Sequence, residues 1–121
     1  MGSPSASTGS HLSTHVLDTS RGRAAADVAV VLEVRTDGTW REISRTATDG
    51  DGRCAQLLPD GTALARATYR LTFATGPYFA ALGIAAFHPE ATVVFEVREP
   101  QERHHVPLLL SPFGYTTYRG T

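Results

Sequence analysis

The stretch Val28-Ala29-Val30-Val31-Leu32-Glu33-Val34-Arg35-Thr36-Asp37-Gly38-Thr39-Trp40 decides the fold class, because its apolar residues recur at every second position. The even-numbered residues from Val28 to Val34 would share one face of an extended strand, since strand side chains alternate between the two faces of a sheet. Asp37-Gly38 is a typical two-residue hairpin turn, and residues 40–48 are expected to return as the partner strand. The stretch therefore predicts an antiparallel β-hairpin.

The same alternation continues on both sides of this hairpin. Further strands are expected over residues 13–18, 53–57, 67–75, 91–98, 104–110 and 115–119. One segment breaks the pattern: Pro77 to Leu82 has Pro at a first helical position and Gly83 just past the end, which predicts one short helix. Seven or eight short strands with a single helix favour an all-β sandwich or barrel that forms one domain.

Composition excludes several functional classes. The chain has 121 residues, 41% hydrophobic and 19% charged, with a net charge of −1, so it is expected to be globular and lacks the basic surplus of a nucleic-acid-binding protein. No apolar run approaches the roughly 18 residues of a membrane helix. Residues 1–10 are rich in Ser and Gly and do not resemble a signal peptide; they are expected to be a disordered leader or a cloning remnant. Cys54 is the lone cysteine, and together these features predict a cytoplasmic protein.

Two residues on separate segments are candidates for chemistry. His15 would share its strand face with Ser13 and Leu17, and it could act as a general base or orient a substrate, because histidine exchanges a proton near neutral pH. The alternative is a half-buried strand histidine that only makes a hydrogen bond. Arg53 follows a tight Asp51-Gly52 turn, and its guanidinium could hold a carbonyl or a urate-like anion with two parallel hydrogen bonds, although most loop arginines are simply solvated.

His104 and His105 are adjacent and must point to opposite faces of their strand. His105 would share its face with Pro107 and Leu109. Three consecutive leucines, at 108–110, predict that both faces are covered, one by the core and the other by a partner subunit. A histidine on the partner-facing side would then line a cleft between subunits, unless it is only the polar start of a strand.

Other candidates for chemistry are weaker. Adjacent histidines diverge, so His104 and His105 are not expected to share a zinc ion with a third histidine. Asp49 and Asp51 are interpreted as a plain turn and not as a metal loop, since the spacing of a calcium-binding loop is absent. Cys54 is expected to be a small buried residue and not a nucleophile. No metal site is therefore predicted.

The linear order of several motifs resembles the transthyretin-like family, over roughly residues 12 to 121. The matching segments are Ser13 to Asp18 followed by Arg21-Gly22-Arg23-Ala24-Ala25, then Asp51-Gly52-Arg53, Tyr78-Phe79 through Phe87-His88-Pro89, and His105 to Tyr115. The tail Tyr118-Arg119-Gly120-Thr121 is similar to the Tyr-Arg-Gly-Ser that marks the hydrolase branch of this family, with Thr121 in place of Ser. No single motif is specific, but the combination is.

This resemblance implies the rest of the expected fold and site. It implies a transthyretin-like sandwich of two four-stranded sheets with one short helix over residues 11–121, assembled as a homotetramer that is a dimer of dimers. It also implies that His15, Arg53 and His105 are catalytic, and that the tail residues Tyr118, Arg119, Gly120 and Thr121 bind substrate, in a cleft where subunits meet. The implied reaction is hydrolysis of 5-hydroxyisourate to 2-oxo-4-hydroxy-4-carboxy-5-ureidoimidazoline in urate breakdown, without cofactor or metal.

The roles within this implied site follow from general chemistry. One of His15 and His105 would activate water, and the other would orient it or protonate the leaving nitrogen; the residues leave open which is which. Arg53 would stabilise negative charge on the substrate oxygen, with Arg119 as a second cation. The main alternative is a non-catalytic transthyretin-like protein that binds a small ligand in the same cleft. A structural β-sandwich module, such as an adhesion domain, is a third interpretation.

Overall fold

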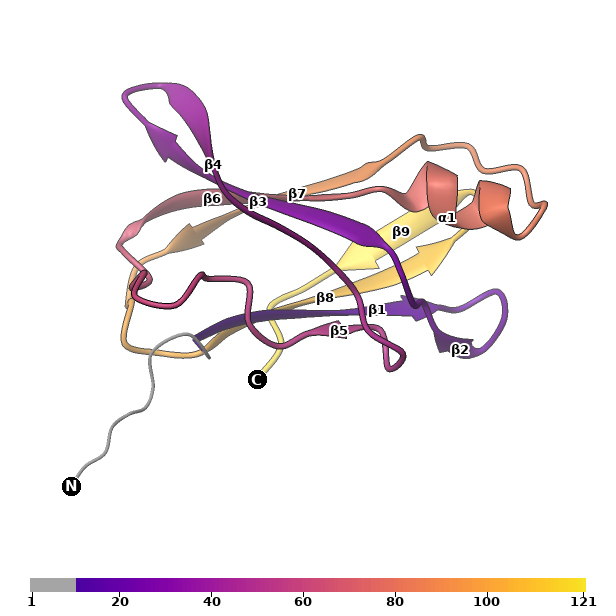
Figure 1. Ribbon diagram of the computed structural model, residues 1–121, viewed down its shortest axis with the longest axis horizontal. Helices are drawn as coiled ribbons and strands as arrows, with labels where there is room; N and C mark the ends of the chain where they lie inside the picture. The colour runs from indigo at the N-terminus through magenta and orange to yellow at the C-terminus, as the bar shows by residue number, and fades with distance from the viewer. Residues whose placement is uncertain (1–10) are drawn as a thin grey trace.

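The computed structural model describes residues 11–121 as two β-sheets packed face to face (Figure 1). The expected leader, residues 1–10, lies outside the described residues. One sheet has the order β4-β3-β6-β7, formed by Thr39–Ala47, Ala29–Thr36, Ala67–Phe73 and Ala91–Val97. The other has the order β2-β1-β8-β9, formed by Arg23–Ala24, Leu12–Asp18, His104–Ser111 and Gly114–Thr117, and β5 (Arg53–Cys54) also pairs with β1. The all-β prediction is confirmed.

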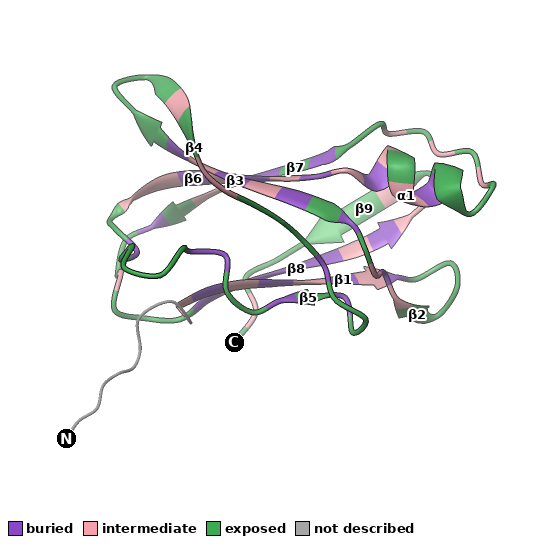
Figure 2. Cartoon of the chain, in the orientation of Figure 1, coloured by how far each residue is buried: buried purple, intermediate pink, exposed green. Residues whose placement is uncertain are grey.

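The hairpin predicted from the alternating stretch is present as β3 and β4. Asp37 and Gly38 both have positive φ, 51° and 79°, which is the backbone of a type I′ turn. The register pairs Thr36 with Thr39 directly across this turn. Val30, Leu32 and Val34 are buried as predicted, and Figure 2 shows buried residues along β3 alternating with half-buried or exposed ones.

The core lies between the two sheets and is built from residues at every second position of the long strands. Tyr69, Leu71 and Phe73 of β6 meet Leu12 and Val16 of β1 in one buried cluster. The outer face of the β1–β8 sheet is therefore left to the intervening residues of β1 and β8, which are partly exposed apart from the buried Pro107. This outer face is where the candidate residues lie.

Several elements differ from the sequence prediction in their bounds, and β2 was not predicted. The helix α1 spans Thr75–Ala81 and begins two residues before Pro77, so Pro77 is not at its first position. The earlier start is allowed by Gly76, whose N–H donates to the carbonyl of Pro89 at 3.0 Å and where a Cβ would lie 2.7 Å from that oxygen. Gly83 follows the helix with φ 73°, as predicted. The strand expected over residues 53–57 is only two residues long.

β2 and β5 are both two-residue strands, and they share one edge of β1. β2 pairs antiparallel with Leu17 and Asp18, whereas β5 pairs with Thr14 and His15. On its other side, β1 runs parallel to β8 over seven residue pairs. Because β2 and β5 occupy successive parts of the same edge, the second sheet has five strands but is at most four strands wide, which fits the expected two four-stranded sheets.

Candidate active site

Three strands bring the predicted catalytic residues together on the outer face of one sheet. The β1–β5 register places His15 beside Arg53, and the β1–β8 register places Ser13 beside His105. Because Thr14 and Cys54 point into the core, the neighbouring His15 and Arg53 point outward. His15 and Arg53, 38 positions apart in the chain, and Ser13 and His105, 92 positions apart, therefore meet through strand pairing.

A cavity of about 200 Å³ lies at this meeting point. Its lining residues are Ser13, Arg53, Arg103, His105, Gly120 and Thr121. We call it the site cavity. Of the predicted site residues it unites Arg53, His105, Gly120 and Thr121, while His15 lies next to Arg53 without lining the cavity. Ser13 and Arg103 were not predicted as site residues; the alternation of β1 places Ser13 on the face of His15, whereas nothing in the sequence singles out Arg103.

Hydrogen bonds fix both histidine rings. The Nε2 atom of His15 lies 2.9 Å from the carbonyl oxygen of Asp51. Since a carbonyl only accepts, Nε2 must carry a proton, and in the neutral ring Nδ1 keeps its lone pair. The Nδ1 atom of His105 lies 2.8 Å from the Ser13 hydroxyl oxygen, so its Nε2 is the nitrogen without a side-chain partner in the described residues.

The electrostatic surroundings favour a neutral His105. Burial lowers the pKa of His105 below its usual 6.5, and the positive charges of His15 and Arg53 lower it further. Arg53 itself follows the turn at Asp49, whose carboxylate accepts hydrogen bonds from the N–H groups of Asp51 and Arg53, both at 2.9 Å. These bonds hold the pKa of Asp49 below its usual value, so the carboxylate stays charged and fixes the turn.

The tail continues the pairing of β9 with β8 beyond Thr117. Gly120 forms a bridge with His105, and its N–H donates to the His105 carbonyl at 2.8 Å. A Cβ at position 120 would lie 2.7 Å from the Cδ2 atom of the His105 ring. The family resemblance implies that Gly120 binds substrate; in the structure, its missing side chain makes room for the His105 ring.

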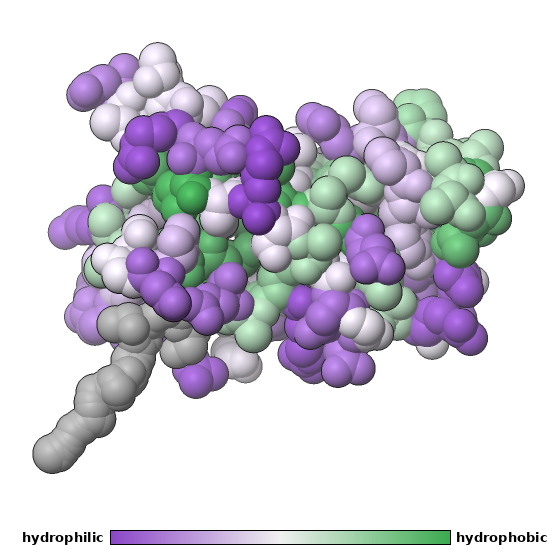
Figure 3. Space-filling view, in the orientation of Figure 1, coloured by the Kyte–Doolittle hydropathy of each residue, from purple (hydrophilic) through white to green (hydrophobic). Residues whose placement is uncertain are grey.

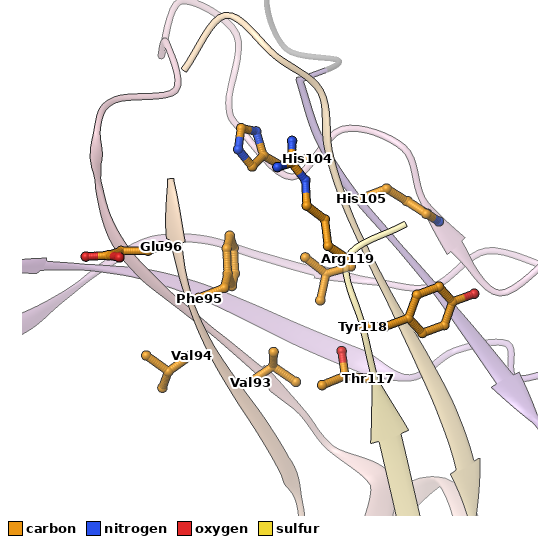
Figure 4. A pocket seen from close by; sticks show the side chains of 10 residues that line it. Val93, Val94, Phe95, Glu96, His104, His105, Thr117, Tyr118 and Arg119 are labelled. Atoms are coloured by element: carbon orange, nitrogen blue, oxygen red, sulfur yellow. The ribbon is translucent and has the colours of Figure 1, made fainter. Parts of the chain in front are cut away.

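Tyr118 and Arg119 lie outside the site cavity. Figure 4 shows His105 and Tyr118 turned to one side of the strand, and His104 and Arg119 turned to the other. The Arg119 guanidinium donates to the Glu102 carboxylate and to the Arg103 carbonyl, both at 3.1 Å. Both tail residues line a second cavity, of about 250 Å³, between β7 and the β8–β9 edge. Arg119 is therefore not placed beside Arg53 as a second cation.

The remaining candidates are structural. His104 is buried, with Nδ1 2.9 Å from the Glu102 carbonyl oxygen. Cys54 is a free, buried thiol whose pKa is raised to about 11, first by burial and then by the nearby charge of Asp49, which makes it a poor nucleophile. Within residues 11–121, no group of three or more His, Cys, Asp or Glu residues is arranged to hold a metal ion. The same residues include no helix long and apolar enough to cross a membrane.

Comparison with known proteins places the chain among relatives of this fold. A sequence profile of the HIUase/Transthyretin family matches residues 12–120. A 5-hydroxyisourate hydrolase of Salmonella typhimurium is 44% identical over 110 residues, which cover 91% of this chain and 80% of the relative. The structure of the Klebsiella pneumoniae 5-hydroxyisourate hydrolase matches with a TM-score of 0.80 at 34% identity, over 91% of this chain and 97% of that one. Sea bream transthyretin in complex with thyroxine matches with a TM-score of 0.84 at 33% identity, over 92% and 95% of the two chains.

Proposed function

The chain belongs to the HIUase/Transthyretin family, and from that premise we propose that it hydrolyses 5-hydroxyisourate, opening the six-membered ring at its lactam to give 2-oxo-4-hydroxy-4-carboxy-5-ureidoimidazoline. The observation that carries this proposal is the meeting of Arg53 and His105 at one cavity, with His15 paired beside Arg53. Curated relatives named 5-hydroxyisourate hydrolase, of which the Salmonella protein is one, support the same reaction.

In the proposed reaction, His105 is the general base. Its depressed pKa keeps the ring neutral near pH 7, and Nε2 is available to take a proton from water. The resulting hydroxide attacks the lactam carbonyl carbon, and Arg53 stabilises the negative charge that develops on the carbonyl oxygen. The ring nitrogen then leaves with a proton, and the carbonyl becomes a carboxylate. His15, fixed through Asp51, orients the reacting groups or supplies that proton.

The proposal extends to a homotetramer, a dimer of dimers, in which a partner subunit completes each site. The site cavity, at about 200 Å³, is smaller than the roughly 300–1,000 Å³ typical of small-molecule sites, so one chain supplies only part of the wall. Leu17 and Leu109 on the same outer face are only partly buried within the chain. Tyr118, exposed on that face, would then wall the cleft between subunits, as the family tail implies. A cytoplasmic location belongs to the same proposal and is supported by the free thiol of Cys54.

The decisive experiment follows the ultraviolet absorbance of freshly generated 5-hydroxyisourate with and without the protein. We expect decay well above the spontaneous rate. His15→Ala, Arg53→Ala and His105→Ala should each lower kcat by about 10²-fold or more, because each removes a proton-transfer or charge-stabilising group. His104→Ala should keep most of the activity while lowering the melting temperature, since it empties a buried position.

The alternative is a binding protein that holds a small ligand without transforming it. The similarity to sea bream transthyretin, whose structure contains thyroxine, keeps this alternative in view. The absorbance assay separates the two functions directly. Decay at the spontaneous rate, with folded protein in excess, would favour binding over hydrolysis.

A further inference from the structure

The hydroxyl of Ser13 has no part in the roles described so far, yet it touches the proposed base. The parallel register of β1 and β8 places Ser13 opposite His105, and Ser13 Oγ lies 2.8 Å from Nδ1. The adjacent hydroxyl has a different purpose: Thr14 points into the core and donates to the Val106 carbonyl at 2.6 Å. Of these two neighbouring hydroxyls, that of Thr14 joins β1 to β8 inside the core, and that of Ser13 faces a ring nitrogen of His105.

The His105 ring is confined on its other side by the tail. The Gly120 main chain lies so near the Cδ2 atom that a Cβ there would approach it to 2.7 Å, and the Gly120 N–H is bound to the His105 carbonyl. The ring is thus held at Nδ1 by β1 and beside Cδ2 by the tail. Nε2 is the ring nitrogen left for the site cavity.

We propose that Ser13 is a positioning residue, which accepts a hydrogen bond from Nδ1–H of His105 and so keeps the lone pair on Nε2. A neutral imidazole has one N–H and one lone pair, and the partner of one nitrogen decides the state of the other. If Ser13 donated instead, Nε2 would carry the proton and could not take one from water. This inference rests on the proposed function, in which His105 Nε2 is the base.

The charged and titratable groups around this ring come from every neighbouring element. They are His15 on β1, Arg53 on β5, Arg103 before β8, His104 on β8, Glu96 on β7, and Tyr118 and Arg119 in the tail. His15 and Arg53 disfavour a positive charge on the ring, whereas a hydrogen bond with the Ser13 main chain acts in the opposite direction.

The test compares Ser13→Ala, Ser13→Thr and a control, Ser44→Ala. Ser44 is also partly buried and donates to a carbonyl, that of Leu57 at 2.6 Å, but it lies on the other sheet. We expect Ser13→Ala to lower kcat/KM about tenfold, the effect of losing one hydrogen bond of roughly 1.4 kcal/mol. Ser13→Thr keeps the hydroxyl and should restore the rate, and Ser44→Ala should leave it unchanged.

The pH profile distinguishes positioning from simple packing. An acceptor at Nδ1 stabilises the imidazolium more than the neutral ring, so its loss should lower the pKa of His105. The acid limb of kcat/KM in Ser13→Ala should then move to lower pH. A limb that moves to higher pH would show that Ser13 donates to Nδ1, and an unchanged rate and profile would show that it does nothing; either result overturns the proposal.

A measurement without substrate separates this inference from the proposed function. The ¹⁵N spectrum of the histidine rings in the labelled wild-type chain should show His105 with Nδ1 protonated and Nε2 unprotonated at neutral pH. In Ser13→Ala the two tautomers should both be populated. A wild-type ring with Nε2 protonated would overturn the positioning role even if hydrolysis is observed. If hydrolysis fails while the spectrum is as expected, the proposed function falls and the Ser13 contact stands.

Discussion

His105 is the residue whose surroundings set the pH dependence of the proposed activity. Its pKa is lowered by burial and then by the charges of His15 and Arg53, so the neutral, basic form persists below the usual 6.5. We expect the acid limb of kcat/KM to lie below pH 6.5, because a base is active only above its pKa. Arg53→Gln should move the acid limb of the residual activity to higher pH, because a charge that lowers the pKa of His105 is lost. Arg45→Gln, on the other sheet, should not move it. A wild-type limb above pH 6.5 would contradict this assignment.

Gly120 is a second residue at which a single substitution should lower the activity. Gly120→Ala would place a methyl group 2.7 Å from the His105 ring and 3.3 Å from the Pro107 Cγ atom, so the ring must shift. A displacement of about 1 Å at a reacting group costs on the order of 10²-fold in rate, and we expect a loss of that size in kcat. The melting temperature should change by only a few degrees, since a chain terminus contributes little to stability.

Gly114→Ala is the matched control for Gly120→Ala. It also lies on the β9 side of the β8 pairing, but a Cβ there meets only the Ser111 hydroxyl, at an ordinary 3.9 Å. Its kcat should equal that of the unmodified chain. Equal activity in both alanine variants would mean that the tail does not confine His105.

At the scale of elements, the turn that leads into β5 positions two site residues. The Asp51 carbonyl accepts the hydrogen bond of His15, and Arg53 directly follows the turn. Gly52 has φ 76°, and a Cβ there would collide with the Val16 carbonyl oxygen. Gly52→Ala should therefore push Asp51 and Arg53 away from β1. We expect a loss of at least about 1–2 kcal/mol from the left-handed backbone alone, a melting temperature lower by roughly 5 °C or more, and loss of most activity.

Gly50→Ala, in the same turn, controls for the loss of a glycine. No atom lies within 4 Å of a Cβ at position 50, and its φ is not in the left-handed region. Thermal unfolding and the absorbance assay on both variants check the expectation. Equal stability of the two variants would show that β5 tolerates displacement from β1.

Elements with local signals were predictable from the sequence, and those fixed by distant contacts were not. The β3–β4 hairpin was predicted because Asp37-Gly38 and the alternation of β3 are both local. The start of α1 depends on Gly76 contacting Pro89, thirteen positions away, and the prediction was wrong by two residues. The partner of Arg119 was not predicted, because its guanidinium bonds to the Glu102 carboxylate, 17 positions away in the chain.

At the scale of the whole molecule, an aromatic patch at the α1 end supports the proposed tetramer. Phe87 and Phe113 are 72% and 74% exposed, and Tyr115 and Leu82 lie exposed as well. The backbone N–H of Phe87 donates to the Pro112 carbonyl at 2.8 Å, which joins the two loops that carry these rings. Figure 3 shows hydrophobic side chains gathered at this end of the molecule. Such a surface is typical of an interface between subunits.

We expect the unmodified chain to scatter light with four times its 13.0 kDa mass. Replacing Phe87 and Phe113 together by Ser should give smaller assemblies with intact secondary structure and reduced activity, because each site would lose its partner wall. Arg45→Ser, an exposed change on β4, should leave the mass unaltered. A 13.0 kDa particle at micromolar concentration, for the unmodified chain, would rule out the tetramer.

The parallel pairing of β1 with β8 also has a consequence for how the protein is made. Ser13 and His105 are partners across the sheet, although 92 residues separate them in the chain. Synthesis proceeds at about 5–20 residues per second from the N-terminus, so β8 is synthesised several seconds after β1. Pairing over such a separation is also slow, because a large loop must close first. Every nascent or prematurely terminated chain that lacks residues 104–120 is therefore without its proposed base, and enzymatic activity would report only on chains whose translation has been completed.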